Sequence, residues 1–176
     1  IEQMLIEQLK AQGYKYLYGP DIAPDSENPM RLSFEDVLLY HKLENAVKRI
    51  NPSLPWLVQE AAIKTVMHLD SPDMLANNET FHRMLTEGIP VSITKDGVER
   101  GERVWLIDFN DFHNNEFTVV NQFTIIENGH NRRPDVLLFV NGLPLVLFEL
   151  KNAADENATL QSAYRQRFTT STELVN

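Results

Sequence analysis

The clearest hydrophobic pattern in the chain is a pair of short apolar runs in its C-terminal third. The runs cover residues 136–140 and 143–148, and Asn141-Gly142 stands between them. Runs of this length that are rich in aliphatic and aromatic residues and bounded by turn-forming residues are typical of buried strands. Because Asn-Gly is a strong hairpin signal, the pattern predicts an antiparallel hairpin.

Elsewhere, helical spacing of apolar residues in the first half gives way to extended patterns. Helices are expected over residues 2–12, 33–50, 55–69, 72–85 and 156–168, and strands over 89–94, 103–109 and 117–126. The first helix is assigned from Met4, Leu5 and Leu9, and the second from Ser33, which with Asp36 resembles a capping box. The fold class is therefore mixed α/β, with a central sheet of about five strands flanked by helices.

Composition limits the class of protein more than its chemistry. The 176 residues suffice for one substantial core and are few for two domains, so a single domain over 1–176 is expected. The chain has no cysteine, which excludes disulfides and thiolate metal sites and fits a cytoplasmic location. No apolar run approaches the roughly 20 residues of a membrane helix. The net charge of −9 argues against strong autonomous DNA binding.

Charged residues appear where the two strands of the hairpin end. Asp135 precedes the first strand, and Glu149 and Lys151 follow the second. An antiparallel hairpin brings these ends together, and two neighbouring carboxylates repel each other unless a cation joins them. A hard divalent ion such as Mg²⁺ would satisfy both, and the Lys151 ammonium could then activate a water. The alternative is a structural cluster in which Lys151 only neutralises Glu149.

The register of the hairpin makes this metal hypothesis testable. If Asn141 and Gly142 formed a regular two-residue turn, Asp135 would lie opposite Phe148 and face away from Glu149, because side chains alternate between faces. A shared metal site therefore requires an odd number of loop residues, or a bulge between the turn and the site. Pro144 favours such an irregularity because it has no N–H for the ladder.

The order of motifs carries a family resemblance. Pro134-Asp135, a hairpin and Glu149-Leu150-Lys151 resemble the PD-(D/E)xK signature of metal-dependent nucleases. Around them, and in the same order as in the family, stand Ile107-Asp108-Phe109, Asn114-Asn115-Glu116-Phe117, Val120-Asn121-Gln122-Phe123, Arg133-Pro134-Asp135, Phe139 to Leu145 and Phe148 to Asn152. This arrangement resembles the N-terminal nuclease domain of the restriction (motor) subunit of type I restriction-modification enzymes, over nearly the whole chain.

The resemblance implies a restriction-endonuclease-like core with a helical insertion at about residues 33–86. It implies that Asp135, Glu149 and the Leu150 carbonyl bind Mg²⁺ and that Lys151 handles the attacking water. The family also carries Gln, and four residues later Tyr, on a helix near the site. Here Gln161 is followed by Tyr164 after three residues, so this chain departs from the family pattern.

Four further residues near these motifs have alternative interpretations. Arg132 and Arg133 are suited to contact DNA phosphates, or they form local salt bridges. Glu2 is either a solvated carboxylate or the helical glutamate that nucleases of this type bring towards the metal. Asp108 either caps a turn or supports the site.

The implied function is Mg²⁺-dependent cleavage of double-stranded DNA within an ATP-dependent type I complex. Its expected partners are DNA and the methylase and specificity subunits, and no membrane. The chain contains no phosphate-binding loop motif, so the ATP-driven translocase is expected outside these residues. The alternative is a catalytically silent nuclease fold that docks the motor onto the methylase.

Overall fold

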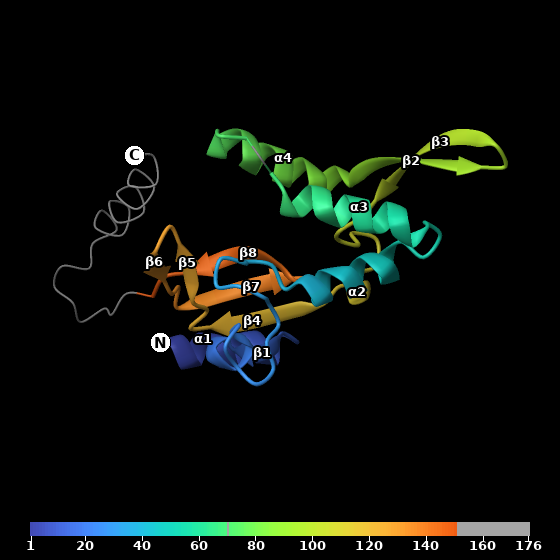
Figure 1. Ribbon diagram of the computed structural model, residues 1–176. Coiled ribbons are helices and arrows are strands. Elements are labelled where there is room, and N and C mark those ends of the chain that lie inside the picture. Colours follow the sequence, from blue (N-terminus) through green and yellow to red (C-terminus); the bar gives the residue numbers. More distant parts are fainter. Residues whose placement is uncertain (70, 151–176) are drawn as a thin grey trace.

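The computed structural model describes residues 1–69 and 71–150 and has the mixed α/β architecture expected from the sequence (Figure 1). Its main sheet has four strands in the order β1-β4-β7-β8. The strands are β1 (Lys15–Tyr18), β4 (Phe117–Asn121), β7 (Val136–Val140) and β8 (Leu143–Phe148). Strand β1 runs parallel to β4, whereas β4, β7 and β8 are antiparallel. The sheet is thus one strand smaller, in the described residues, than the sequence pattern suggested.

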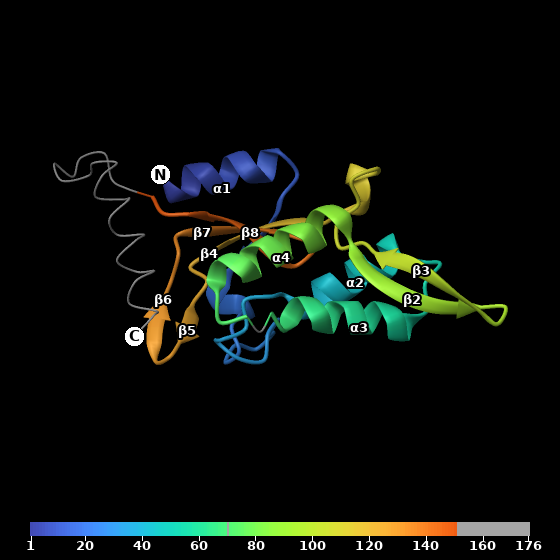
Figure 2. The ribbon, with the colours of Figure 1, turned by 90° about the horizontal axis from the view of Figure 1, so that it is seen from above.

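Helices cover the sheet on both sides. They are α1 (Glu2–Ala11), α2 (Tyr40–Ile50), α3 (Trp56–Met67) and α4 (Met74–Glu87), with short 3-10 helices η1 (Gly19–Ile22) and η2 (Phe112–Asn114). Figures 1 and 2 show α1 along one side of the sheet and α2 to α4 on the other. None of the helices in the described residues is long and apolar enough to cross a lipid bilayer.

Two small hairpins stand apart from the main sheet. They are formed by β2 (Ile89–Lys95) with β3 (Val98–Val104), and by β5 (Ile125–Glu127) with β6 (His130–Arg132). The β2–β3 hairpin projects away from the rest of the molecule (Figures 1 and 2). The strand expected over 103–109 is wrong beyond Val104, where β3 ends.

Alternation of side chains along the central strands supplies a core on each face of the sheet. On the α1 side, Ile6 and Leu9 pack with Val119, Val136 and Leu138. On the opposite face a second cluster contains Ile22, Leu39, Val120, Phe123, Leu137 and Phe139. Burying one side chain of this size stabilises the fold by about 1.5–3 kcal/mol. The assignment of α1 from Met4, Leu5 and Leu9 is wrong at Met4, which is 68% exposed, and Ile6 is buried instead.

The helix expected from Ser33 begins instead at Tyr40. Asp36 does accept a hydrogen bond from the Ser33 N–H, so the capping contact forms, but it closes a turn. The reason lies in Arg31, whose buried guanidinium donates to the carbonyls of Phe34 and Asp36. The Phe34 carbonyl also accepts from the Ile126 N–H. Carbonyls that would carry the first helical turn are therefore already occupied.

The long strand expected over 117–126 is also interrupted. Gln122 takes a left-handed backbone conformation (φ +54°), which ends β4 and turns the chain away from the sheet. The chain then forms the β5–β6 hairpin around Asn128-Gly129, a second Asn-Gly turn with φ of +49° and +77°. His130 is the first residue of β6.

The tip of the β7–β8 hairpin is anchored in the body of the protein. Asn141 and Gly142 both have positive φ (+53° and +82°), as an Asn-Gly turn requires. The Gly142 carbonyl accepts from the N–H of Leu39, the residue before α2. A Cβ at Gly142 would lie 2.5 Å from the Leu39 carbonyl oxygen, so only glycine fits this close approach of two backbones.

Candidate metal-binding site

The hairpin has the irregularity that a shared site for Asp135 and Glu149 requires. Val140 pairs with Leu143 across a two-residue turn, but a bulge between Leu138 and Phe139 shifts the register thereafter. Val136 then pairs with Phe148, the last pair of the ladder, and continuation of this register would set Asp135 opposite Glu149. The expectation of a bulge is thus confirmed, and Leu145 is the extra residue in β8.

Packing of the neighbouring side chains independently supports the same orientation. Phe148 and Leu150 pack against the cluster on the α1 side of the sheet, to which Val136 also belongs. Asp135 and Glu149 lie one residue beyond the strands, and continued alternation would turn both to the opposite side. The register is therefore compatible with two carboxylates on one face at the open end of the hairpin.

Asp135 is half-buried and held by the strand that follows the turn. Its Oδ2 accepts the Leu150 N–H at 2.6 Å, and its carbonyl accepts the Gln122 N–H at 3.3 Å. Within the described part of the chain, the Asp135 Oδ1 makes no hydrogen bond. Glu149 is exposed. The carboxylate of Asp135 is thus fixed in position by the backbone that carries Glu149.

The donor set suits Mg²⁺ only as part of a hydrated site. Within residues 1–69 and 71–150, no three acidic or histidine side chains lie close enough to hold a metal ion together. Mg²⁺ commonly keeps several waters and is bound by one or two carboxylates plus substrate phosphates. Asp135, Glu149 and the Leu150 carbonyl fit this kind of binding, with water or phosphate oxygens completing the coordination.

Glu2 lies at the same end of the sheet, but on its other side. Its carboxylate accepts from Asn121 Nδ2 at 2.6 Å and from Gln122 Nε2 at 3.2 Å. Tyr16 Oη donates to Asn121 Oδ1 at 2.9 Å and so turns the amide nitrogen of Asn121 towards Glu2. Burial, then the nearby negative charges of Tyr18, Glu2 and Asp21, raise the pKa of Tyr16 and keep it a donor.

The adjacent amides of Asn121 and Gln122 both bind Glu2. The Glu2 carboxylate is therefore hydrogen-bonded to two side chains at the end of β4, and a role for it near the metal stays a prediction. Tyr16 was missed, since nothing in its local pattern marks it as a partner of Asn121.

Asp108 has the contacts of a turn-capping residue. Its Oδ1 accepts the N–H groups of Asn110 and Asp111, and its Oδ2 accepts Asn114 Nδ2 at 2.9 Å. The hydrogen bond from Asn114, followed by those from the backbone, lowers the pKa of Asp108. Through Asn115, its loop is joined to the turn end of the hairpin, which is the end away from Asp135.

The remaining residues proposed from the sequence are partly outside the described structure. Arg132 lies in β6, where its Nε is buried without a hydrogen-bond partner among the described residues, and Arg133 is exposed. Lys151, Gln161 and Tyr164 lie outside the described residues, as does the helix expected over 156–168.

Comparison with known proteins adds the family to this geometry. Residues 1–175 match the model of the family described as "Type I restriction enzyme R protein N terminus". The chain belongs to this family. The resemblance inferred from the order of motifs is thereby confirmed, and the mixed sheet flanked by helices is consistent with a nuclease-like fold.

Relatives of this R protein family have been curated in distant organisms. The chain is 38% identical over 167 residues to the type I restriction enzyme HindI endonuclease subunit of Haemophilus influenzae, covering 94% of this chain. It is 36% identical over 175 residues to the putative type I restriction enzyme MjaIXP endonuclease subunit of Methanocaldococcus jannaschii, covering 96%. The matched region is 16% of the length of each relative.

Proposed function

We propose that this chain provides the DNA-cleaving site of a type I restriction enzyme, acting on double-stranded DNA with Mg²⁺. The observation that carries the proposal is the bulged register of β7 and β8 in a chain of the R protein family, because its continuation would set Asp135 opposite Glu149. A regular hairpin would have separated the two carboxylates. Their common face supports a shared cation rather than two independent surface acids.

Each residue has a distinct role in the proposed reaction. Asp135 and Glu149 would hold Mg²⁺, which would supply charge stabilisation at the scissile phosphate. The Leu150 N–H holds Asp135 in place, and the Leu150 carbonyl would be a further ligand. Lys151 would orient a water for attack on phosphorus and take part in its deprotonation, while the P–O bond to the leaving oxygen of the cut strand breaks. Arg132 and Arg133 precede Asp135 and would contact the DNA backbone.

Variants that replace each carboxylate by the matching amide test the metal site with little disturbance of the fold. Asp135→Asn keeps an oxygen that accepts the Leu150 N–H, and Glu149→Gln keeps the size of its side chain. Both should abolish Mn²⁺ binding in titration calorimetry, because each removes one of two anionic ligands. Glu127→Gln, an exposed acid in β5, is the matched control and should bind normally. Undiminished binding in both site variants would exclude the shared cation.

Cleavage is best measured in an assembled complex. Lys151→Ala should remove DNA cleavage and leave ATP hydrolysis by the translocase intact. Loss of both activities together would mean that Lys151 is structural. With Mg²⁺ but without its partners, the 176-residue chain should cut plasmid DNA poorly, because its net charge of −9 weakens DNA binding.

A catalytically silent docking module is the competing function. It is favoured by the net charge and by the departure of Gln161 and Tyr164 from the family spacing. It predicts that Asp135→Asn and Glu149→Gln leave restriction by the complex unchanged. Normal cleavage by both variants would therefore establish the docking role and refute the nuclease proposal.

A further inference from the structure

A cleft of about 340 Å³ opens at the end of the sheet farthest from Asp135. It is lined by Gly13, Lys15, Arg49, His113, Asn115, Glu116 and Phe117. Phe117 pairs with Val140 at the far end of β7, so the length of that strand, about 17 Å, separates the cleft from the candidate metal site. The cleft is therefore a distinct feature of the surface.

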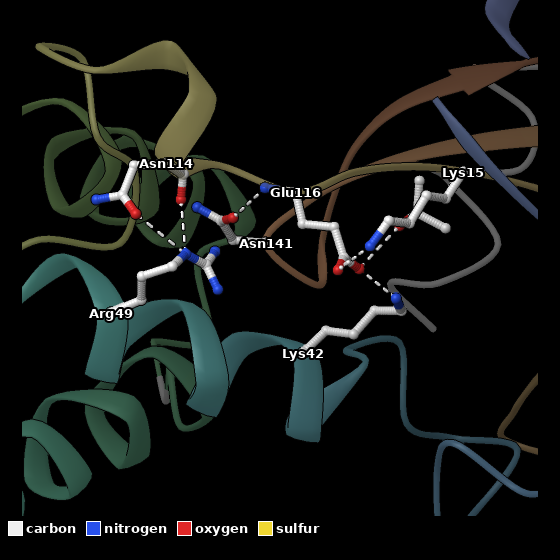
Figure 3. Close-up of polar contacts among 7 residues, drawn as sticks. Lys15, Lys42, Arg49, Asn114, Glu116 and Asn141 are labelled. Atoms are coloured by element: carbon white, nitrogen blue, oxygen red, sulfur yellow. Dashed lines mark hydrogen bonds and ion pairs between the residues drawn. The ribbon is translucent and has the colours of Figure 1, made fainter. Parts of the chain in front are cut away.

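Positive charge is concentrated at this cleft. Lys15 and Arg49 line the cleft together with one carboxylate, Glu116, which forms ion pairs with Lys15 and Lys42 (Figure 3). Two further acids, Asp108 and Asp111, lie in the adjoining loop, where their carboxylates accept N–H groups of that loop. The two cations of the lining outnumber its single carboxylate, which favours binding of an anion there.

Asn114 holds Arg49 through its Nε, which is the only guanidinium nitrogen bonded within the described residues. Its Nε donates to the backbone carbonyl of Asn114 at 2.9 Å and to Asn114 Oδ1 at 3.1 Å. Figure 3 shows the terminal nitrogens on the side facing Glu116. Neither terminal nitrogen makes a hydrogen bond or ion pair with the described residues. A guanidinium oriented in this way can donate two parallel hydrogen bonds to the oxygens of one phosphate.

An aromatic stack borders the charged part of the cleft. The ring of Phe112 lies 4.5 Å from that of Phe117 at an angle of 23°, and Tyr14 packs edge-on against Phe117 at 5.6 Å. Phe112 is nevertheless 66% exposed. One face of its ring is supported by Phe117, so the exposed ring is available for stacking. Aromatic platforms beside cationic grooves are typical of sites that bind unpaired nucleotides.

We propose that this cleft binds a single-stranded segment of nucleic acid, with a backbone phosphate at Arg49 and Lys15 and a base stacked on Phe112. A paired base is already stacked within its duplex and cannot use Phe112 in this way. The proposal does not depend on the nuclease function, because it needs neither Asp135, Glu149 nor a metal. It assigns the cleft to holding an unpaired strand away from the point of cleavage.

Fluorescence anisotropy of a labelled oligothymidylate, in EDTA at low ionic strength, tests the phosphate contact. Arg49→Ala should weaken binding about tenfold, because it removes charge-assisted hydrogen bonds. The slope of log K against log salt concentration should also decrease in magnitude by about 0.7. The control is Arg83→Ala, which removes the same charge from the exposed side of α4 and should bind like the wild type.

Glu116→Gln separates the proposal from a loss of folding. Removing this carboxylate frees Lys15 and Lys42, so the variant should bind the oligonucleotide several-fold more tightly even if it is less stable. Phe112→Leu should weaken binding about fivefold or more through lost stacking. Its control is Phe109→Leu, which changes an equally exposed aromatic residue (64%) that makes no ring contact in the described structure.

Three results would overturn the proposal. The first is equal affinity of Arg49→Ala and Arg83→Ala for the oligonucleotide. The second is binding of a duplex with the same dependence on Phe112 as the single strand. The third concerns the source of the phosphate: if thymidine monophosphate or inorganic phosphate binds as tightly as the oligonucleotide, the site serves a small anion instead of a strand.

Discussion

Replacing Asn141 with glycine separates the two reasons for an asparagine at the hairpin turn. Glycine accepts the positive φ of this position, so the backbone conformation is retained. The variant loses the side chain, whose Oδ1 accepts the Glu116 N–H at 2.8 Å. Its Nδ2 donates to the Leu106 carbonyl and to Asn115 Oδ1, each at 2.9 Å. Asn141 is fully buried, and water does not replace these bonds without rearrangement.

The expected loss follows from these three bonds. Each contributes about 1 kcal/mol net to stability, and a buried group left without a partner costs about 1–3 kcal/mol. Added backbone freedom in the unfolded state contributes about 0.5 kcal/mol more. Asn141→Gly should therefore lower the free energy of unfolding by at least about 3 kcal/mol. In urea this corresponds to a midpoint lower by about 1.5 M, if the m-value is about 2 kcal/mol/M.

The chain provides a matched control in its other Asn-Gly turn. Asn128 has nearly the same φ (+49°) but is exposed, and its side chain makes no hydrogen bond in the described residues. Asn128→Gly should change stability by less than about 0.5 kcal/mol. Both variants are compared by urea unfolding followed by circular dichroism. If their free energies of unfolding agree within about 0.5 kcal/mol, the buried hydrogen bonds of Asn141 add nothing and the reasoning fails.

Three further predictions concern other parts of the fold. Arg31→Met should destabilise the protein by about 2–4 kcal/mol in thermal unfolding, because it removes buried hydrogen bonds from a guanidinium that also lies 3.8 Å from the centroid of the Phe123 ring. Burial raises the pKa of Glu116, but the hydrogen bonds and charges of two lysines outweigh burial and hold that pKa below its usual value. The ionised Glu116 therefore stabilises the folded protein above its unfolded pKa of about 4.3, and this contribution is lost as pH falls through the lower folded pKa. In acid unfolding curves, the difference in stability between the wild type and Glu116→Gln should vanish. Deleting Leu145 should restore a regular register, turn Glu149 to the other face and abolish Mn²⁺ binding with little change in the circular dichroism spectrum; retained binding would contradict the register argument.

Local sequence patterns predicted those elements of the fold whose structure depends on residues close together in the chain. The Asn-Gly hairpin, α1, α3 and α4 follow from apolar spacing and turn residues. The bulge could also be predicted from the sequence, because alternation of side chains is a strict geometric constraint and Pro144 weakens regular pairing. For the candidate site, this reasoning predicted the irregular register, while the common face of Asp135 and Glu149 stays a prediction.

The misplaced elements depend on contacts between distant parts of the chain. Arg31 prevents a helix at Ser33 by binding local carbonyls, and it also donates to the Thr124 carbonyl, 93 residues away. Likewise, Glu2 receives its amide partners only because α1 packs beside the end of β4, 119 residues from Asn121. Periodicity and turn propensity describe neither contact. Such long-range hydrogen bonds override local preference at both positions.

The anchored hairpin tip has a mechanical consequence for the opposite end. Gly142 and Asn141 fix the turn to α2 and to the loops of Leu106 and Glu116, while Val146 and Leu147 remain about two-fifths exposed (43% and 42%) along the outer strand. The hairpin is therefore fixed at its turn, whereas β8 is the edge strand of the main sheet in the described residues. Because the Leu150 N–H also binds the Asp135 carboxylate, a displacement of β8 at its far end would move Glu149 and that carboxylate together, so their relative position is protected from bending of the edge strand.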